Sequence, residues 1–163
     1  MQIQTTPVAL AEMLIRRPVS EVFEAFVNPE LTRQFWFTKS SGRLEADKQL
    51  RWDWEMYGKS AQVNVKIIDK NKRILIEWGT GDPDSATTAE WIFTPRSDES
   101  TFVSIKESGF GGSGDDIVQR ALASTQGFTL VLAGAKALLE HRVRLNLIAD
   151  RFPDNIVSGW RAQ

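Results

Sequence analysis

Carboxylates are the side chains of this chain that could carry chemistry in an apolar site, because thiols are missing and histidine occurs once. The 163 residues include no cysteine and a single histidine, His141. Thiol nucleophiles, cysteine-based zinc sites and multi-histidine metal sites are therefore excluded. His141 lies near the end of a long predicted helix, where a surface or capping role is typical. No carboxylate cluster has the spacing of metal ligands, so we expect neither a metal nor a cofactor.

Glu107 is the one candidate for acid or base chemistry. It shares a strand face with Val103 and Ile105, which we expect to point inward. A carboxylate facing an apolar cavity is costly unless it is paired or protonated, so it could orient a ligand or transfer a proton. The alternative is that the strand frays beside Gly109 and Glu107 meets solvent or an arginine. Glu12 raises the same question with a weaker pattern.

The segment Gly109–Gly114 matches the G-x-G-x-x-G pattern of dinucleotide-binding loops. That pattern needs a strand–helix–strand unit with a parallel second strand, and no strand follows the helix here. Asp115 and Asp116 would also repel a pyrophosphate at the helix start. We therefore expect a mobile loop at the mouth of a cavity, without a nucleotide.

Tryptophans supply a second kind of candidate site, an aromatic surface for a flat apolar ligand. Four of the six fall on apolar strand faces, and two apolar side chains of the C-terminal helix face them: Trp52, Trp54, Trp78, Trp91, Phe128 and Leu132. We expect at least two of these tryptophans to line a cavity; the alternative is simple filling of the core. Trp36, at the end of a short helix, either guards an entrance or anchors that helix to the sheet.

The charge pattern indicates no polyanionic partner. Twenty basic and 21 acidic residues give a formal net charge of −1, with no basic run. A nucleic-acid binder usually has a basic excess or stripe, so no nucleic acid is expected. The N-terminus lacks a signal-peptide core, and the longest apolar run, about Leu130–Ala135, falls short of the ~20 residues of a membrane span. We expect a cytoplasmic protein without a membrane span.

The elements that must position these side chains are strands, mostly joined by short turns. Alternation and turn residues predict seven strands: Val8–Ile15, Arg43–Glu45, Leu50–Met56, Ala61–Ile67, Ile74–Trp78, Ala89–Phe93 and Val103–Glu107. Strands this close together favour one antiparallel sheet with one face covered.

Helices are predicted on either side of the strand-rich region. Apolar spacing after Pro18 predicts a helix that ends at Asn28-Pro29, and a short helix follows over Glu30–Phe35. Asp115-Asp116 can cap a long helix that runs to about Leu139, and Gly127 and Gly134 inside it suggest close approach to another element. His141–Arg151 predicts a second or continuing helix. A length of 163 residues favours one domain, with a core over residues 8–153 and a loose tail over 154–163.

This order of elements resembles the START-like helix-grip superfamily, also called SRPBCC. Within it the chain is similar to the branch of homologues of the heat-shock-protein ATPase activator. The stretches that carry the resemblance are Ile15-Arg16-Arg17-Pro18-Val19 with Val22-Phe23 and Ala25-Phe26, Asn28-Pro29-Glu30 with Phe35-Trp36, Gly109-Phe110, and Gly127-Phe128 with Leu132 and Leu139-Glu140. The resemblance implies an α+β fold, a curved antiparallel sheet wrapped around a long C-terminal helix. It also implies an apolar cavity between the two.

The function expected from these observations is binding of a small apolar or aromatic molecule, by a monomer or homodimer, without catalysis. The expected ligand-binding side chains are Trp36, Trp52, Trp54, Trp78, Trp91, Glu107, Phe110, Phe128 and Leu132. One alternative is a cyclase- or hydrolase-type enzyme that uses Glu107. Another is a co-chaperone-like interaction module, which would need an exposed apolar patch.

Overall fold

A curved sheet that grips one long helix forms the molecule. The computed structural model describes residues 2–162, and in that range seven antiparallel strands follow the order β1-β7-β6-β5-β4-β3-β2. The strands are β1 Ala9–Ile15, β2 Lys39–Ser40, β3 Gln49–Trp54, β4 Lys59–Asp69, β5 Arg73–Gly79, β6 Thr87–Ser97 and β7 Ser100–Ser108. The helices are α1 Val19–Val27, α2 Pro29–Thr32, α3 Gly114–His141 and α4 Leu147–Asp150, with 3-10 turns at Glu55–Tyr57, Pro83–Ser85 and Pro153–Asn155.

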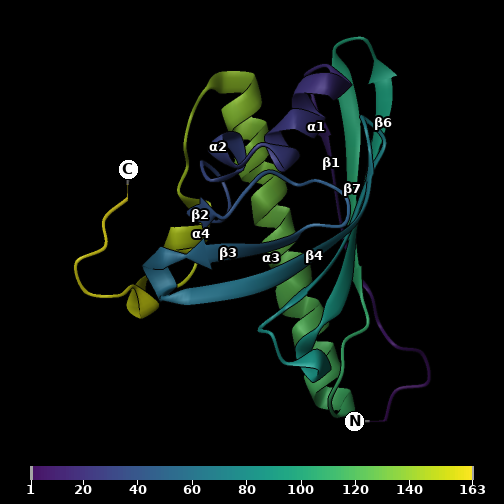
Figure 1. Ribbon diagram of the computed structural model, residues 1–163, viewed down its shortest axis with the longest axis vertical. Helices are drawn as coiled ribbons and strands as arrows, with labels where there is room; N and C mark the ends of the chain where they lie inside the picture. The colour runs from purple at the N-terminus through teal and green to yellow at the C-terminus, as the bar shows by residue number, and fades with distance from the viewer. Residues whose placement is uncertain (1, 163) are drawn as a thin grey trace.

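The long helix α3 lies along the sheet, and α1 and α2 pack near its C-terminal end (Figure 1). The C-terminal segment that follows α3 turns back toward β3 and β4 (Figure 1). This is the α+β helix-grip arrangement that the order of elements predicts. The side chains of one sheet face and of α3 therefore meet in a shared interior.

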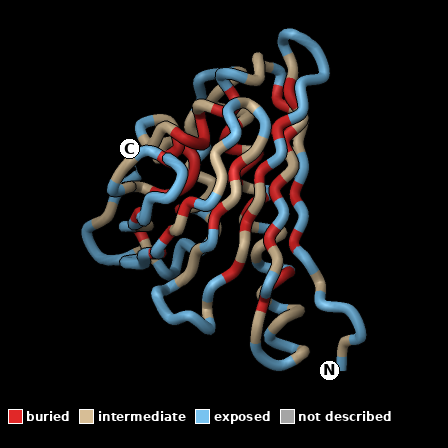
Figure 2. The backbone as a smooth tube through the Cα atoms, turned by 45° about the vertical axis from the view of Figure 1, so that its right-hand side comes forward, coloured by how far each residue is buried: buried red, intermediate tan, exposed pale blue. Residues whose placement is uncertain are grey.

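Alternation along the strands builds that interior. In β6, Ala89, Trp91 and Phe93 are buried, and in β7 Val103 and Ile105 are fully buried. Figure 2 shows buried positions recurring along the neighbouring strands with more exposed positions between them. A period of two puts every second residue on the same sheet face, so the inward assignments made from the sequence hold for these strands.

The sequence predicts Asp115-Asp116 as the cap of α3, but the N-cap is Ser113, two residues before Asp115. Ser113 is the N-cap: its hydroxyl accepts the Asp116 backbone N–H at 3.2 Å, and the Asp116 carboxylate accepts the Ser113 N–H at 3.1 Å. Asp116 therefore completes a capping box, and Asp115 lies in the first turn, where the helix dipole favours an acid.

Both glycines inside α3 mark close approaches, as expected. A Cβ atom at Gly134 would lie 3.1 Å from the Cβ of Phe35, and one at Gly127 would lie 2.9 Å from Nη1 of Arg151. Gly134 thus lets the end of the α2 region pack onto the helix, and Gly127 lets the C-terminal segment cross it.

Two predicted elements are wrong. Arg43–Glu45 is not a strand, because Leu44 is buried and its N–H donates to the Val27 carbonyl of α1 instead of a strand. The second strand is Lys39–Ser40, paired with β3. His141–Arg151 is not one helix, because Arg142 takes a left-handed conformation with φ of 56° and ends α3. Within the predicted range, Leu147–Asp150 is the part that is α-helical beyond Arg142.

The inward face of β1 carries small side chains. Ala9 and Ala11 are buried, whereas Leu10 is 47% exposed and Glu12 is exposed. The expectation that Glu12 could face the interior is therefore wrong. Alanines on this face let α3 approach the strand closely, and only small residues leave room for such packing.

Length and composition alone would allow α3 to cross a membrane. Phe128, Val131, Leu132 and Ala135 of the helix are buried against the sheet, which is the packing of a core helix. We therefore treat α3 as the central helix of the fold.

Glu140 ties the C-terminal end of α3 to the loop before α1. Its carboxylate accepts the Arg16 backbone N–H at 3.0 Å and the Lys136 ammonium at 2.5 Å. Lys136 also donates to the Leu14 carbonyl at 2.8 Å. Burial raises the pKa of Glu140, but these two donors outweigh it and hold the pKa below the usual glutamate value.

Replacing Glu140 by glutamine is expected to lower the free energy of unfolding by about 1–2 kcal/mol at neutral pH, because it weakens two charge-assisted hydrogen bonds. A carboxyl whose pKa is lowered by folding stabilises the fold above its unfolded pKa, and the effect disappears as the pH falls through the folded value. The difference between wild type and Glu140→Gln in urea denaturation should therefore shrink below the ordinary glutamate pKa of 4.5. Glu12→Gln, at an exposed site, is the matched control; a pH-independent difference would contradict the assignment.

Candidate functional site

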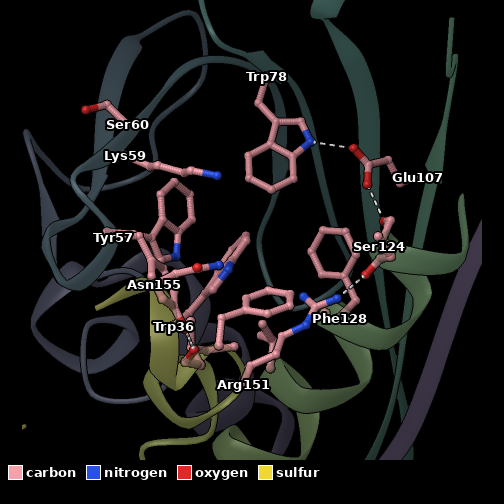
Figure 3. A pocket seen from close by; sticks show the side chains of 16 residues that line it. Trp36, Tyr57, Lys59, Ser60, Trp78, Glu107, Ser124, Phe128, Arg151 and Asn155 are labelled. Carbon is pink, nitrogen blue, oxygen red and sulfur yellow. Dashed lines mark hydrogen bonds between the residues drawn. The ribbon is translucent and has the colours of Figure 1, made fainter. Parts of the chain in front are cut away.

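A cavity of about 570 Å³ lies between β3–β5, α3 and the C-terminal segment. Six of its sixteen lining residues are aromatic. The rings come from five separate parts of the chain: Trp36, Trp54 with Tyr57, Trp78, Phe128 and Phe152. Figure 3 shows several of these rings surrounding the open space, with Trp78 and Phe128 near Glu107.

Trp36 is the centre of the aromatic cluster. Its ring centroid lies 4.9 Å from that of Trp52, 5.7 Å from Trp78 and 5.7 Å from Phe128. It is only 7% exposed. The residue therefore joins the short helical region to the sheet and to α3, and it also contributes to the cavity wall. The packing-anchor alternative considered for Trp36 from the sequence therefore holds, and the ring lines the cavity as well; its role as an entrance guard stays a prediction.

Glu107 forms a polar patch on this apolar wall. Its side chain is 6% exposed. One carboxylate oxygen accepts the Trp78 indole N–H at 2.9 Å and the Thr87 hydroxyl, and the other accepts the Ser124 hydroxyl. Removing a carboxylate from water is costly when it has no hydrogen-bond partner. The three donors offset that cost. The strand does not fray at this point, because Glu107 still pairs with Ala9 and Ala89 in the sheet.

Strand and helix periodicity explain how the donors converge. Thr87 lies two residues before Ala89 on the inward face of β6, and Trp78 lies two residues after Ile76 on the inward face of β5. Ser124 precedes Phe128 by four residues, so both project from the same side of α3. The three elements therefore bring three donors to one carboxylate.

Two cations lie on other parts of the cavity wall. Lys59, the first residue of β4, reaches toward the cavity from the side opposite Glu107 (Figure 3). In the part of the chain that the structure describes, no hydrogen bond or ion pair joins its ammonium group to another side chain. Arg151 comes from the C-terminal segment and donates through Nη2 to the Ala123 carbonyl and to Gln126 Oε1, both at 3.0 Å. Burial lowers the pKa of Arg151 below the usual arginine value.

The C-terminal segment is held over the cavity by backbone contacts. The Tyr57 hydroxyl donates to the carbonyls of Ile148 and Ala149, and burial raises the pKa of Tyr57. Further along, the Val157 N–H donates to the Met56 carbonyl at 2.8 Å. Ile148, Arg151, Phe152 and Asn155 consequently form part of the lining.

The structure brings five of the predicted site residues to the cavity: Trp36, Trp54, Trp78, Glu107 and Phe128. Trp52, Trp91 and Leu132 do not line it, because each is at most 1% exposed inside the main core. Phe110 packs instead in a separate cluster with Ala9 and Ala121, under the Arg120 guanidinium. The Gly109–Gly114 loop that carries Phe110 contributes no residue to the cavity, so its expected place at the mouth is wrong.

Several lining residues were missed from the sequence. Lys59 shares strand parity with the buried Ala61 and Val63, so alternation held a signal for it. Ser124 could have been found from its helical spacing to Phe128. Arg151, Phe152 and Asn155 gave no usable signal, since their position depends on how the chain turns after α3.

The described residues contain no group of three or more histidine, cysteine, aspartate or glutamate side chains that could hold a metal ion. A second cavity of about 260 Å³ lies beyond Trp36, among α2, α4 and the segment around Trp160. It is smaller and more polar in its lining. A third hollow, of about 820 Å³, lies along α1 and the segment around Leu44, so the aromatic cavity is not the largest. The aromatic cavity is the candidate site because it brings Trp54, Trp78 and Phe128 together with Glu107.

Comparison with known proteins agrees with this architecture. The chain is similar in structure to protein SSP2350 from Staphylococcus saprophyticus, with a TM-score of 0.73 and 29% identity over 85% of this chain and 96% of that one. It also resembles the Aha1 dimer from Colwellia psychrerythraea, with a TM-score of 0.70 and 14% identity over 83% of this chain and 97% of that one.

A third similar structure is BexL, a di-domain ARO/CYC protein from the BE-7585A biosynthetic pathway, with a TM-score of 0.71 and 16% identity over 82% of this chain and 46% of that one. A search of curated proteins found no match. The sequence model described as "Activator of Hsp90 ATPase homolog 1-like protein" matches residues 16–140. Because that match covers most of the chain, the protein belongs to the Activator of Hsp90 ATPase homolog 1-like family of the SRPBCC superfamily.

Proposed function

We propose that this protein binds a small apolar or aromatic molecule in the cavity between its sheet and α3. The observation that carries the proposal is the aromatic wall formed by Trp36, Trp54, Trp78 and Phe128 around about 570 Å³ of space. Ligand sites are typically apolar cavities of this size with a few placed polar groups. Glu107, Ser124 and Lys59 supply such polar groups here.

Aromatic rings suit this task for a physical reason. Each ring offers a large rigid apolar surface, and the edge-to-face contacts between Trp36 and its neighbours hold the rings in place before a ligand arrives. A preorganised wall loses little conformational entropy when a ligand binds. Flat apolar ligands therefore gain most from this cavity.

Titration with naphthalene derivatives, flavonoids and medium-chain fatty acids tests the proposal. Three tryptophans line the cavity, so a bound compound should change the intrinsic tryptophan fluorescence in a saturable way, and calorimetry should give one site per chain. Unsaturable changes with every compound, together with no heat of binding, would count against the proposal.

A second candidate is an enzyme of cyclase or hydrolase type that uses Glu107 as acid or base. It is favoured by a carboxylate in the cavity wall beside the Ser124 hydroxyl, and the similar structure BexL is described as an ARO/CYC protein. If it holds, Glu107→Gln abolishes turnover of a bound compound while the variant still binds it. Equal turnover by wild type and variant would exclude Glu107 as the reacting group.

A co-chaperone-like role is supported by family membership alone. The large exposed apolar side chains are distributed over β1, β6, α3 and the C-terminal segment.

The description of the Colwellia protein as a dimer supports the proposal that this protein is a monomer or a homodimer, which light scattering tests. A cytoplasmic location is likewise a proposal, based on the sequence.

A further inference from the structure

The two sides of the aromatic cavity offer opposite polar chemistry. Glu107 is the single acidic residue among the described lining residues, and Lys59 and Arg151 are the basic ones. Figure 3 shows Glu107 and Lys59 on opposite sides of the space, with aromatic rings between them. A ligand long enough to fill the space would meet an acceptor at one end and a cation at the other.

Glu107 has one acceptor position left. A carboxylate has about four lone-pair positions on its two oxygens. Oε2 uses two of them for Trp78 and Thr87, whereas Oε1 accepts only from Ser124. The remaining position on Oε1 belongs to a residue that lines the cavity. It can accept a hydrogen bond from a hydroxyl or N–H group of a ligand, and it repels a group that has only lone pairs.

Lys59 has the complementary property. Its ammonium group donates hydrogen bonds and accepts none. With Arg151 it gives the lining one more positive than negative charge. Arg151 uses Nη2 for Ala123 and Gln126, and its buried Nε has no hydrogen-bond partner among the described residues. Lys59, at the exposed start of β4, is the cation that lies across the space from Glu107 and can meet an acidic group at that end of a ligand. An acidic group at that end of the ligand would be partly shielded from water by the Trp54 and Trp78 rings. Its attraction to the Lys59 ammonium group is stronger there than in water.

We infer that the cavity selects aromatic acids that carry a hydrogen-bond donor at the end opposite the acid, with Glu107 receiving the donor and Lys59 the acidic group. This inference rests on the proposed function and names its ligand class. It differs from simple apolar binding, because a compound without end groups would fill the cavity but leave both polar side chains unused.

Four naphthalene compounds test the inference by calorimetry. The first is the hydroxynaphthoic acid whose hydroxyl and carboxyl groups lie at opposite ends of the rings. The second replaces the hydroxyl by methoxy, which removes the donor and keeps the oxygen. The methyl esters of both remove the acid. The hydroxy acid should bind about tenfold more tightly than the methoxy acid and about fivefold more tightly than its own ester, in line with one hydrogen bond to a charged group and one partly exposed ion pair.

Variants assign each preference to its residue. Lys59→Met should remove the preference for acid over ester and leave the preference for hydroxy over methoxy. Glu107→Gln should weaken the preference for hydroxy over methoxy and leave the other. Lys106→Met, at an exposed position next to Glu107 in β7, is the matched control and should keep both preferences. Lys59 is exposed, so its variant remains informative even where Glu107→Gln folds poorly.

Equal affinities for all four compounds would overturn the inference and leave the proposed function intact. Preferences that survive Lys59→Met and Glu107→Gln unchanged would also overturn it, because other groups would then recognise the ends. Failure of all four compounds, and of the wider panel, to bind wild type would contradict the proposed function itself.

Discussion

Replacing Trp36 by alanine is expected to lower the free energy of unfolding by about 3–5 kcal/mol, the range for removing a buried large aromatic side chain. The indole ring lies within 6.1 Å, centroid to centroid, of rings on β3, β5, β6 and α3. Its removal would leave a void among rings that cannot collapse onto one another without losing their sheet positions. The whole free energy of unfolding of a typical domain is about 5–15 kcal/mol, so the expected loss is a large fraction of it.

Urea denaturation measures this loss, and Trp160→Ala provides the matched control. Trp160 lies in the C-terminal segment with its side chain half-buried, so its truncation should cost about 1 kcal/mol or less. The same Trp36 variant should lose ligand binding, because one wall of the cavity disappears. If Trp36→Ala were no less stable than Trp160→Ala, the ring would not be the centre of the aromatic cluster.

Replacing Ala123 by tryptophan is expected to weaken binding of any cavity ligand at least tenfold, about 1.4 kcal/mol. Ala123 is an exposed residue of α3 that lines the cavity. An indole at this position would occupy space that a ligand needs, while the buried face of the helix stays unchanged. The effect on stability should therefore be small.

Leu122→Trp is the control for that experiment. Leu122 is the neighbouring residue, it is 62% exposed, and it does not line the cavity. Consecutive residues on a helix point about 100° apart, so an indole at this position projects elsewhere. Calorimetry with the hydroxynaphthoic acid should give wild-type affinity for Leu122→Trp. Equal weakening by both substitutions would show that bulk on α3, and not occupation of the cavity, causes the loss.

Much of the fold could be predicted because most of its strands alternate between buried and more exposed residues, although a register shift between Val65 and Ile67 interrupts the alternation in β4. Trp52, Trp91 and Ile105 each lie inward as period-two patterns require. Errors arose where tertiary contacts override local pattern. Leu44 lies between the charged Arg43 and Glu45, an alternation that resembles a strand, but its N–H donates to the Val27 carbonyl of α1. The end of α3 depends on Arg142, which adopts a left-handed backbone conformation. Glycine is the usual residue at such a position, so an arginine there does not predict the end of a helix.

The site could be predicted only in part. Parity and helical spacing bring Trp54, Trp78, Glu107 and Phe128 to the same interior. They do not say which inward rings fill the core and which line a cavity, because that depends on where the sheet curves away from α3. Trp52 and Trp54 lie two residues apart on one strand face, and only Trp54 lines the cavity. The contribution of Arg151 required knowing how the chain turns back across Gly127.

The side-chain N–H groups of the tryptophans give the most direct test of the central claim, that the cavity between sheet and α3 binds the ligand. Each indole N–H gives its own signal in a nitrogen–proton correlation spectrum. On titration with the hydroxynaphthoic acid, the signals of Trp54 and Trp78, which line the cavity, should shift in a saturable way. The signal of Trp160, which lines only the smaller cavity, should stay in place. Shifts confined to Trp160, or no saturable shift at Trp54 and Trp78 while calorimetry reports binding, would contradict the claim.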